Sequence, residues 1–130
     1  MKKIILLIVM FSFTISLSSC LRISKIESNF EDAGYTYSED SSFVAESLLL
    51  EFKRDEVEVS IYAYNKLGRV AIVIEFDDED DIATSLESNN VLKNLTSKYD
   101  KDEITNKRFL VIPIATTEVG EQEILDVFQD

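Results

Sequence analysis

The stretch EVEVSIYAYNKLGRVAIVIEF, residues 56–76, decides the fold of this chain. Along residues 56–64 apolar and polar side chains alternate, which is typical of a β-strand with one buried face. Along residues 69–76 both sets of alternate positions are apolar, and this pattern predicts a central strand covered on both sides. Asn65 to Gly68 separate the two runs, with Gly68 where a tight turn needs positive φ. We therefore expect an antiparallel hairpin.

Upstream of the hairpin, the sequence predicts a helix over residues 25–33. Ser24 to Glu27 match a capping box, in which the serine hydroxyl and the glutamate side chain satisfy free backbone N–H groups. Gly34 can end this helix because it tolerates positive φ. Apolar side chains recur at helical spacing, at Ile26, Phe30 and Ala33.

Two further segments lie between this helix and the hairpin. Residues 35–37 are β-prone and short, which predicts an edge strand. The run FVAESLLLEF at residues 43–52 is ambiguous. Its length and its content of Ala, Glu and Leu favour a helix, whereas its apolar density also fits a buried strand. We expect a helix and keep the strand as the alternative.

Downstream of the hairpin, a helical stripe follows the acidic run DDEDD at residues 77–81 and weakens around residues 88–90. Residues 108–115, RFLVIPIA, form a predicted apolar strand. Pro113 cannot donate to a ladder, so it should lie at an edge or a bulge. Residues 121–129 predict a short closing helix. The stripe consists of Ile82, Leu86, Val91 and Leu95.

The predicted elements define an α+β fold. An N-terminal helix precedes the order β-α-β-β-α-β, and a short C-terminal helix ends the chain. This order is the ferredoxin-like, or split βαβ, arrangement. It predicts an antiparallel sheet with the helices packed on one face.

The charge balance excludes several classes of partner. The 130 residues hold 13 Lys and Arg against 25 Asp and Glu, for a net charge of −12 at pH 7. Without a signal that contains Lys2 and Lys3, 11 basic residues would face 25 acidic ones, a charge of −14. Nucleic-acid binding and adhesion to anionic lipid both need a cationic surface, so both are disfavoured.

The absence of histidine and the single cysteine, Cys20, exclude several kinds of chemistry. Ser-His-Asp and Cys-His catalysis cannot be assembled within this chain. An intramolecular disulfide and a thiolate metal site are also impossible. We expect no catalytic residues, no metal site and no cofactor.

Residues 1–20, MKKIILLIVMFSFTISLSSC, have the three-part layout of an export signal. A transmembrane helix needs about 20 mainly apolar residues, which is longer than the apolar stretch here. The alternative is an uncleaved apolar helix in which Cys20 is buried. The three parts are a basic region at Lys2 and Lys3, an apolar region at residues 4–17, and small residues at Ser18 and Ser19.

The tetrapeptide Leu17-Ser18-Ser19-Cys20 resembles the lipobox of bacterial lipoproteins, an aliphatic residue and two small residues before a cysteine. The resemblance implies that the thiol of Cys20 receives a diacylglyceryl group. It also implies that a signal peptidase cuts between Ser19 and Cys20, which makes Cys20 the mature N-terminus. This covalent lipid would be the only added group.

The same resemblance implies a domain organisation and a location. Residues 1–19 would be the removed signal, residues 20–24 the lipidated cysteine and tether, and residues 25–130 a single domain. The domain would be held on the extracytoplasmic face of the cell membrane. In a Gram-negative cell, the absence of Asp after the cysteine, where Leu21 stands, would imply the outer membrane.

Two clusters could carry function. The acidic run at residues 77–81 could bind a hard cation such as Ca²⁺. We favour helix capping, with Asp77 or Asp78 as N-cap and the other acids near the positive end of the helix dipole. Four tyrosines could form a contact surface on the exposed side of the sheet, or pack across strands beneath a helix. They are Tyr35, Tyr37, Tyr62 and Tyr64.

These observations predict a non-enzymatic, membrane-anchored binding or accessory domain, monomeric, whose partner would be an envelope protein or a glycan. A hydrolase that uses a pair of carboxylates, or a subunit of an envelope complex, is the alternative. A concave pocket with two buried carboxylates would favour the enzyme. A flat tyrosine-bearing face would favour binding.

Overall fold

The computed structural model describes residues 22–38 and 43–130. The predicted export signal, its cleavage site between Ser19 and Cys20, and the lipidation site at Cys20 lie outside these residues. The described residues form six helices and a five-stranded antiparallel sheet. The elements are α2 (Ile23–Asp32), β1 (Thr36–Ser38), α3 (Phe43–Arg54), β2 (Val59–Lys66), β3 (Arg69–Phe76), α4 (Asp80–Ser88), α5 (Asn90–Thr96), α6 (Lys101–Ile104), β4 (Thr105–Asn106), β5 (Phe109–Ala115) and α7 (Glu118–Gln129).

The predicted hairpin is confirmed and forms the centre of the sheet. The strand order is β1-β2-β3-β5-β4, so β3 is the middle strand, and every neighbouring pair is antiparallel. The register joins Val59 to Phe76 at one end of the hairpin and Lys66 to Arg69 at the turn. Gly68 has φ +74°, as the turn requires. The predicted α+β class, with its closing helix, is confirmed.

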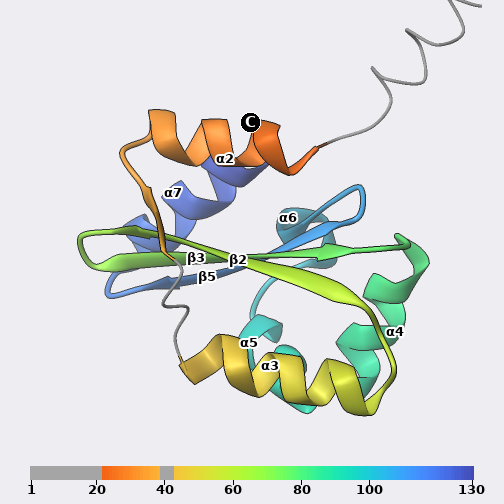
Figure 1. Ribbon diagram of the computed structural model, residues 1–130. Helices are drawn as coiled ribbons and strands as arrows, with labels where there is room; N and C mark the ends of the chain where they lie inside the picture. The colour runs from red at the N-terminus through yellow and green to blue at the C-terminus, as the bar shows by residue number, and fades with distance from the viewer. Residues whose placement is uncertain (1–21, 39–42) are drawn as a thin grey trace, which may run out of the picture.

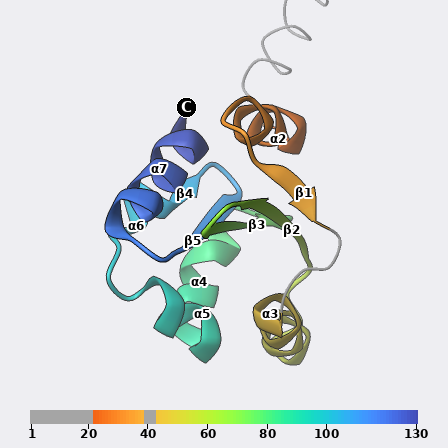
Figure 2. The ribbon, with the colours of Figure 1, turned by 90° about the vertical axis from the view of Figure 1, so that its left-hand side faces the viewer.

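We had expected all helices on one face of the sheet, but they pack on both faces. Figures 1 and 2 show α2 and α7 on one face of the sheet and α3, α4 and α5 on the other. The sequence explains this arrangement, because Ala71 and Val73 on one face of β3 are as fully buried as Ile72 and Ile74 on the other. A strand that is apolar on both sides needs cover on both sides.

Some element boundaries differ from those predicted. The helix α2 begins at Ile23 rather than at residue 25, and its N-cap position, Arg22, makes no side-chain cap. The capping box expected at Ser24 therefore does not form, and the predicted tether at 20–24 ends earlier. The ambiguous segment at 43–52 is a helix, as we favoured. The strand β2 begins at Val59 rather than at residue 56, because it starts where Phe76 ends its partner β3.

The predicted break near residues 88–90 and the predicted place of Pro113 are both confirmed. Asn89 separates α4 from α5, and its side chain accepts the backbone N–H of Leu92 at 3.0 Å as an N-cap. Pro113 lies in β5 opposite Ala71. The short strand β4 reaches only Phe109 and Leu110, so in the described structure β5 is an edge strand at Pro113.

Candidate binding groove

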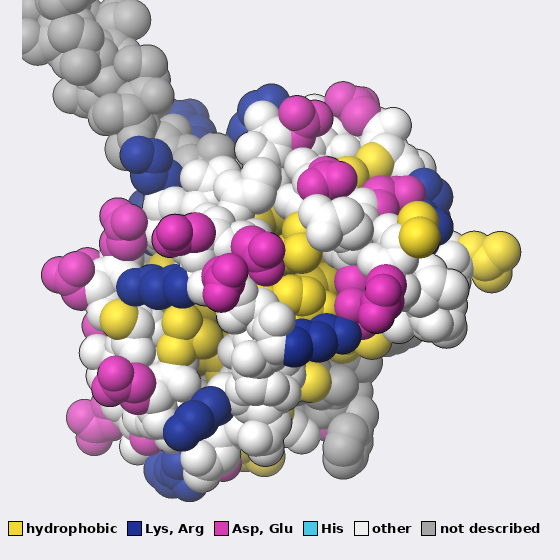
Figure 3. Space-filling view, turned by 180° about the vertical axis from the view of Figure 1, so that it is seen from behind, with side chains coloured by type: hydrophobic (Ala, Val, Ile, Leu, Met, Phe, Trp, Pro, Cys, Tyr) yellow, Lys and Arg dark blue, Asp and Glu magenta, His cyan; other side chains and the backbone are white. Residues whose placement is uncertain are grey.

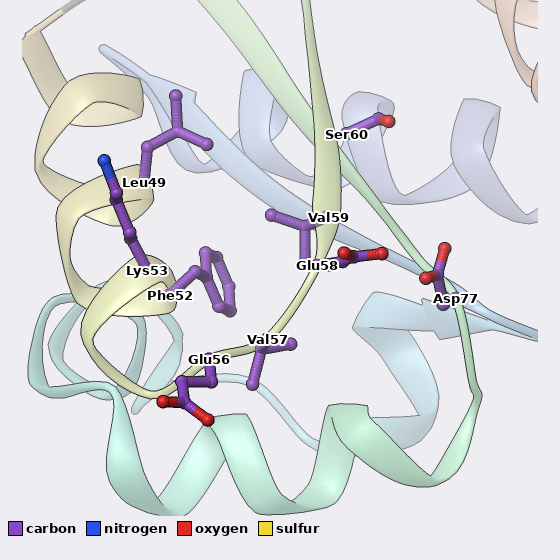
Figure 4. Close-up of a pocket in the computed structure, with 9 residues that line it drawn as sticks. All are labelled: Leu49, Phe52, Lys53, Glu56, Val57, Glu58, Val59, Ser60 and Asp77. Carbon is purple, nitrogen blue, oxygen red and sulfur yellow. The ribbon is translucent and has the colours of Figure 1, made fainter.

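An open groove of about 740 Å³ lies between α3 and the start of β2, within the size range of ligand pockets. In Figure 4 the side chain of Phe52 points from α3 toward Val59 on β2. The carboxylates of Glu58 and Asp77 lie on the other side of β2, away from α3. The lining residues are Leu49, Phe52, Lys53, Glu56, Val57, Glu58, Val59, Ser60 and Asp77.

The end of α3 shapes the floor of the groove. The backbone N–H of Val57 bonds to the carbonyl of Phe52 at 2.9 Å, and that of Glu56 bonds to the carbonyl of Lys53 at 3.2 Å. This pair of bonds is the Schellman motif, which places the residue after the C-cap in the left-handed region. That residue is Glu56, with φ +59°. The motif reverses the chain and brings Val57 beside Phe52.

One side of the groove is the start of β2, from Val59. Within the described residues, β1 pairs with β2 at Ala63, Tyr64 and Asn65, and β3 pairs along the whole of β2. Residues 39–42, which follow β1, lie outside the described part of the chain.

The rim of the groove is acidic and its helix side is apolar. Glu56, Glu58 and Asp77 are all exposed, and Lys53 is the one basic residue among those that line it. Leu49 is 45% exposed, and Leu50, which follows it on α3, is 70% exposed. Figure 3 shows that, on the face seen from behind, acidic side chains are spread across the surface among fewer basic ones.

The acidic run contributes one residue to the groove and the rest to the start of α4. The N-cap position is Glu79, which makes no side-chain cap, so the prediction of Asp77 or Asp78 as the N-cap residue is wrong by one or two positions. Asp78 nonetheless accepts the backbone N–H of Asp80 at 3.0 Å. Within residues 22–38 and 43–130, no group of three or more potential ligand side chains could hold a metal ion.

The four tyrosines gather on the α2 side of the sheet, but they do not form one exposed surface. Tyr64 is fully buried and stacks on Phe30 of α2, with ring centroids 5.1 Å apart. Tyr35 is also buried, whereas Tyr37 is 42% exposed and Tyr62 is partly exposed. The packing alternative therefore holds for Tyr35 and Tyr64, because α2 covers the sheet at that point.

A charged cluster that the sequence analysis did not predict lies at the hydroxyl end of Tyr35. The carboxylate of Glu123 on α7 accepts hydrogen bonds from Lys66 at 3.0 Å, from the Tyr35 hydroxyl at 2.9 Å, and from Arg69. The hydrogen bond from Lys66 is the largest cause of the lowered pKa of Glu123, which falls to about 2. Burial, aided by Glu123, raises the pKa of Tyr35 to about 12.

This cluster ties α7 to the turn end of the hairpin, and Gly120 permits the close approach. A Cβ at Gly120 would lie 2.9 Å from the Cβ of Ala115 and 3.0 Å from Nε of Arg69. Because Glu123 accepts hydrogen bonds from three protein donors, the cluster has a packing role. The groove at α3 and β2 is the better candidate for a site.

Comparison with known proteins gives no family model, curated protein or solved structure that matches this chain. Among the described residues, no helix is long and apolar enough to cross a membrane.

Proposed function

We propose that this chain is a bacterial lipoprotein whose domain is a non-enzymatic binding or accessory module. The signal at residues 1–19 is removed between Ser19 and Cys20, and a diacylglyceryl group on Cys20 anchors the domain to the extracytoplasmic face of the membrane. Two acyl chains hold a protein firmly, whereas a single chain gives only reversible binding. The partner is an envelope protein or a glycan, and the groove is where it binds.

The groove between α3 and β2 is the observation that carries the binding function. It combines an apolar side with an acidic rim. Its carboxylates, at Glu56, Glu58 and Asp77, are exposed. A catalytic general acid needs a raised pKa, which usually comes from burial, so the exposed carboxylates favour binding over the alternative of a carboxylate hydrolase.

The position of α2 supports a domain held close to the membrane. Only Leu21 and Arg22 separate Cys20 from the first residue of α2, Ile23. A chain extends at most about 3.5 Å per residue, so Ile23 would lie within roughly 10 Å of the lipidated residue. The groove belongs to α3, on the opposite face of the sheet from α2 (Figure 2). A partner could therefore reach it while the lipid is inserted.

Membrane fractionation of cells that express Cys20→Ser tests the anchor. The variant should leave the membrane fraction or accumulate with its signal attached, and it should take up no labelled fatty acid. Ser19→Gly keeps a small residue before the cysteine and should stay anchored and cleaved. Cleaved Cys20→Ser protein that still fractionates with the membrane would show that the lipoprotein assignment is wrong.

Photo-crosslinking in intact cells tests the binding role. A crosslinking side chain at Ser60, on the groove, should give a discrete product with one envelope component. The same side chain at Ser28, which is exposed on α2, should give none. Equal products from the two positions, or none from Ser60, would contradict a binding role for the groove.

A further inference from the structure

We infer that the tyrosine rings exposed on the α2 side of the sheet, together with one glutamate of α2, bind a lysine side chain of a partner protein. The residues are Tyr37, Tyr62 and Glu27, and we call them the tyrosine surface. None of them lines the groove, so this surface is a second contact that does not depend on the first. Three observations support it: the placement of the residues, the charge that they leave unpaired, and two similar arrangements within the chain.

The strand register places the tyrosines together on one side of the sheet. Tyr37 of β1 lies opposite Tyr64 of β2, with ring centroids 5.9 Å apart, and Tyr62 lies two residues along β2 on the same side. The helix α2 covers Tyr64, but Tyr37 stays 42% exposed and Tyr62 stays partly exposed. The Tyr64 hydroxyl donates to Glu27 of α2 at 3.4 Å, which holds this carboxylate beside the rings.

The carboxylate of Glu27 is the charge that this surface leaves unpaired. In the described part of the chain it accepts the Tyr64 hydroxyl, and no basic side chain lies within ion-pair distance of it. Glu75, by contrast, accepts both the Tyr62 hydroxyl at 3.2 Å and Arg108 at 2.9 Å. Burial, aided by Glu27, raises the pKa of Tyr64, so this hydroxyl stays protonated and Glu27 carries the negative charge.

Two arrangements elsewhere in the chain show how a tyrosine and a glutamate hold an ammonium group. The Nζ atom of Lys66 lies 5.3 Å from the centroid of the Tyr35 ring and bonds to Glu123 at 3.0 Å. The Nζ atom of Lys98 lies 5.3 Å from the centroid of the Tyr99 ring and bonds to another glutamate of α7 at 2.7 Å. In both, a cation–π contact is combined with an ion pair.

Tyr37 and Glu27 offer the same two groups to a lysine from another molecule, because both contact Tyr64. A compact ammonium group can reach the ring and the carboxylate together, as Lys66 and Lys98 do. The apolar stem of a lysine can pack along the exposed part of Tyr62. The net charge of −12 favours a basic partner protein and disfavours a second copy of this chain.

Aromatic NMR spectra test this site in the full chain, isotope-labelled on its tyrosines and purified in a nonionic detergent. The probe is an end-blocked tripeptide of sequence glycine-lysine-glycine. It should shift the ring signals of Tyr37 and Tyr62 saturably, in the millimolar range expected of a single side-chain contact. The signal of Tyr99, which already holds a lysine, should not move. The same tripeptide acetylated on its lysine Nζ has no charge and should shift none of these signals.

Matched variants locate the contact, with the Tyr62 signal as the readout. Tyr37→Leu removes the exposed ring, and Glu27→Gln removes the charge but keeps an acceptor for the Tyr64 hydroxyl. Each should weaken binding by about two- to five-fold, the contribution of one exposed cation–π contact or ion pair. Glu46→Gln, the same change on α3, and Leu49→Ala, in the groove, should leave binding unchanged. Circular dichroism checks that each variant is folded.

Each contrary result overturns the inference. Equal weakening in Glu27→Gln and Glu46→Gln would mean attraction to the overall charge, and undiminished binding by Tyr37→Leu would mean that the ring has no part. Shifts that the acetylated tripeptide reproduces would mean that the ammonium group is not recognised. Ethanolamine that shifts the two rings at lower concentration than the tripeptide would make a small amine the ligand. The absence of a saturable shift at either ring would remove the site, and the crosslinking test of the groove would stand unaffected.

Discussion

The ends of α2 and α3 have the same backbone geometry but different residues at the critical position. In α2, the N–H of Tyr35 bonds to the carbonyl of Phe30, and that of Gly34 bonds to the carbonyl of Glu31. In α3, Val57 and Glu56 make the equivalent two bonds. The left-handed residue is Gly34 in the first, with φ +94°, and Glu56 in the second, with φ +59°. A glutamate there costs about 1–2 kcal/mol that a glycine does not.

The surroundings of the two helix ends differ as well. Beyond α2, the rings of Phe30 and Tyr35 pack edge to face with centroids 5.2 Å apart, and Tyr35 also bonds to Glu123 of α7. Beyond α3, Phe52 and Val57 border the open groove. A left-handed residue other than glycine carries local backbone strain. In α3 this strained residue is Glu56, which lines the open groove.

The largest difference between the two regions should appear when apolar side chains are truncated. Phe30→Ala should cost about 3–5 kcal/mol of unfolding free energy, because it removes a fully buried ring that stacks on Tyr64. Leu49→Ala, on the groove, should cost about 0.5 kcal/mol or less. Urea denaturation of the two variants measures both. Equal costs would show that the groove is closed in solution.

Exchanging the left-handed residues should change stability in opposite directions. Gly34→Ala should destabilise by about 1–2 kcal/mol. A Cβ there would lie 3.6 Å from Cε of Lys66, an ordinary contact, so the cost comes from the backbone. Glu56→Gly should stabilise by about 1 kcal/mol, because glycine adopts positive φ at no steric cost. Urea denaturation measures both changes, and a destabilised Glu56→Gly variant would contradict the strain assigned to Glu56.

The two helix ends also show what the sequence could and could not predict. The hairpin and Gly34 could be predicted because alternation and helix termination are local signals. The apolar positions on both sides of residues 69–76 already implied cover on both faces, which conflicts with the ferredoxin-like expectation of helices on one face. The structure follows the local pattern.

The groove and the charged cluster could not be predicted, because both depend on distant pairings. The groove joins α3 and the start of β2 to Asp77, which follows β3. The cluster joins Glu123 to Lys66 and Arg69, which are 57 and 54 residues away in the chain. The alternating pattern predicts that Glu56 begins a strand. Its left-handed conformation follows instead from the way α3 ends, which the pattern does not show.

The contribution of Glu123, beside the end of α2, to the stability of the fold should depend on pH. Its pKa falls to about 2 in the folded protein, below its ordinary value of 4.5, chiefly because Lys66 and Arg69 bond to the carboxylate. A lowered folded-state pKa contributes stability that is present above about pH 4.5 and is lost as the pH falls toward 2. Glu123→Gln should cost roughly 1 kcal/mol at pH 7 and much less near pH 2. Thermal melts from pH 7 to pH 2 measure this, with Glu31→Gln as the control. A cost that does not depend on pH would exclude the charge as its cause.

The smallest effect is expected beside the open groove, in the acidic residues that begin α4. Asp80 and Asp81 lie in the first turn of that helix, where the dipole favours negative charge. Asn at each position should cost about 0.3–1 kcal/mol, and less in high salt. If the run bound a hard cation instead, millimolar Ca²⁺ would stabilise the fold by mass action, and the Asn variants would lose that gain. Because the run is spread over a turn and a helix start, its carboxylates do not converge on one point. We expect calorimetry of the full chain to show a Ca²⁺-dependent shift in Tm of no more than about one degree. A shift of several degrees that the Asn variants abolish would assign the run to a cation and would contradict the capping role.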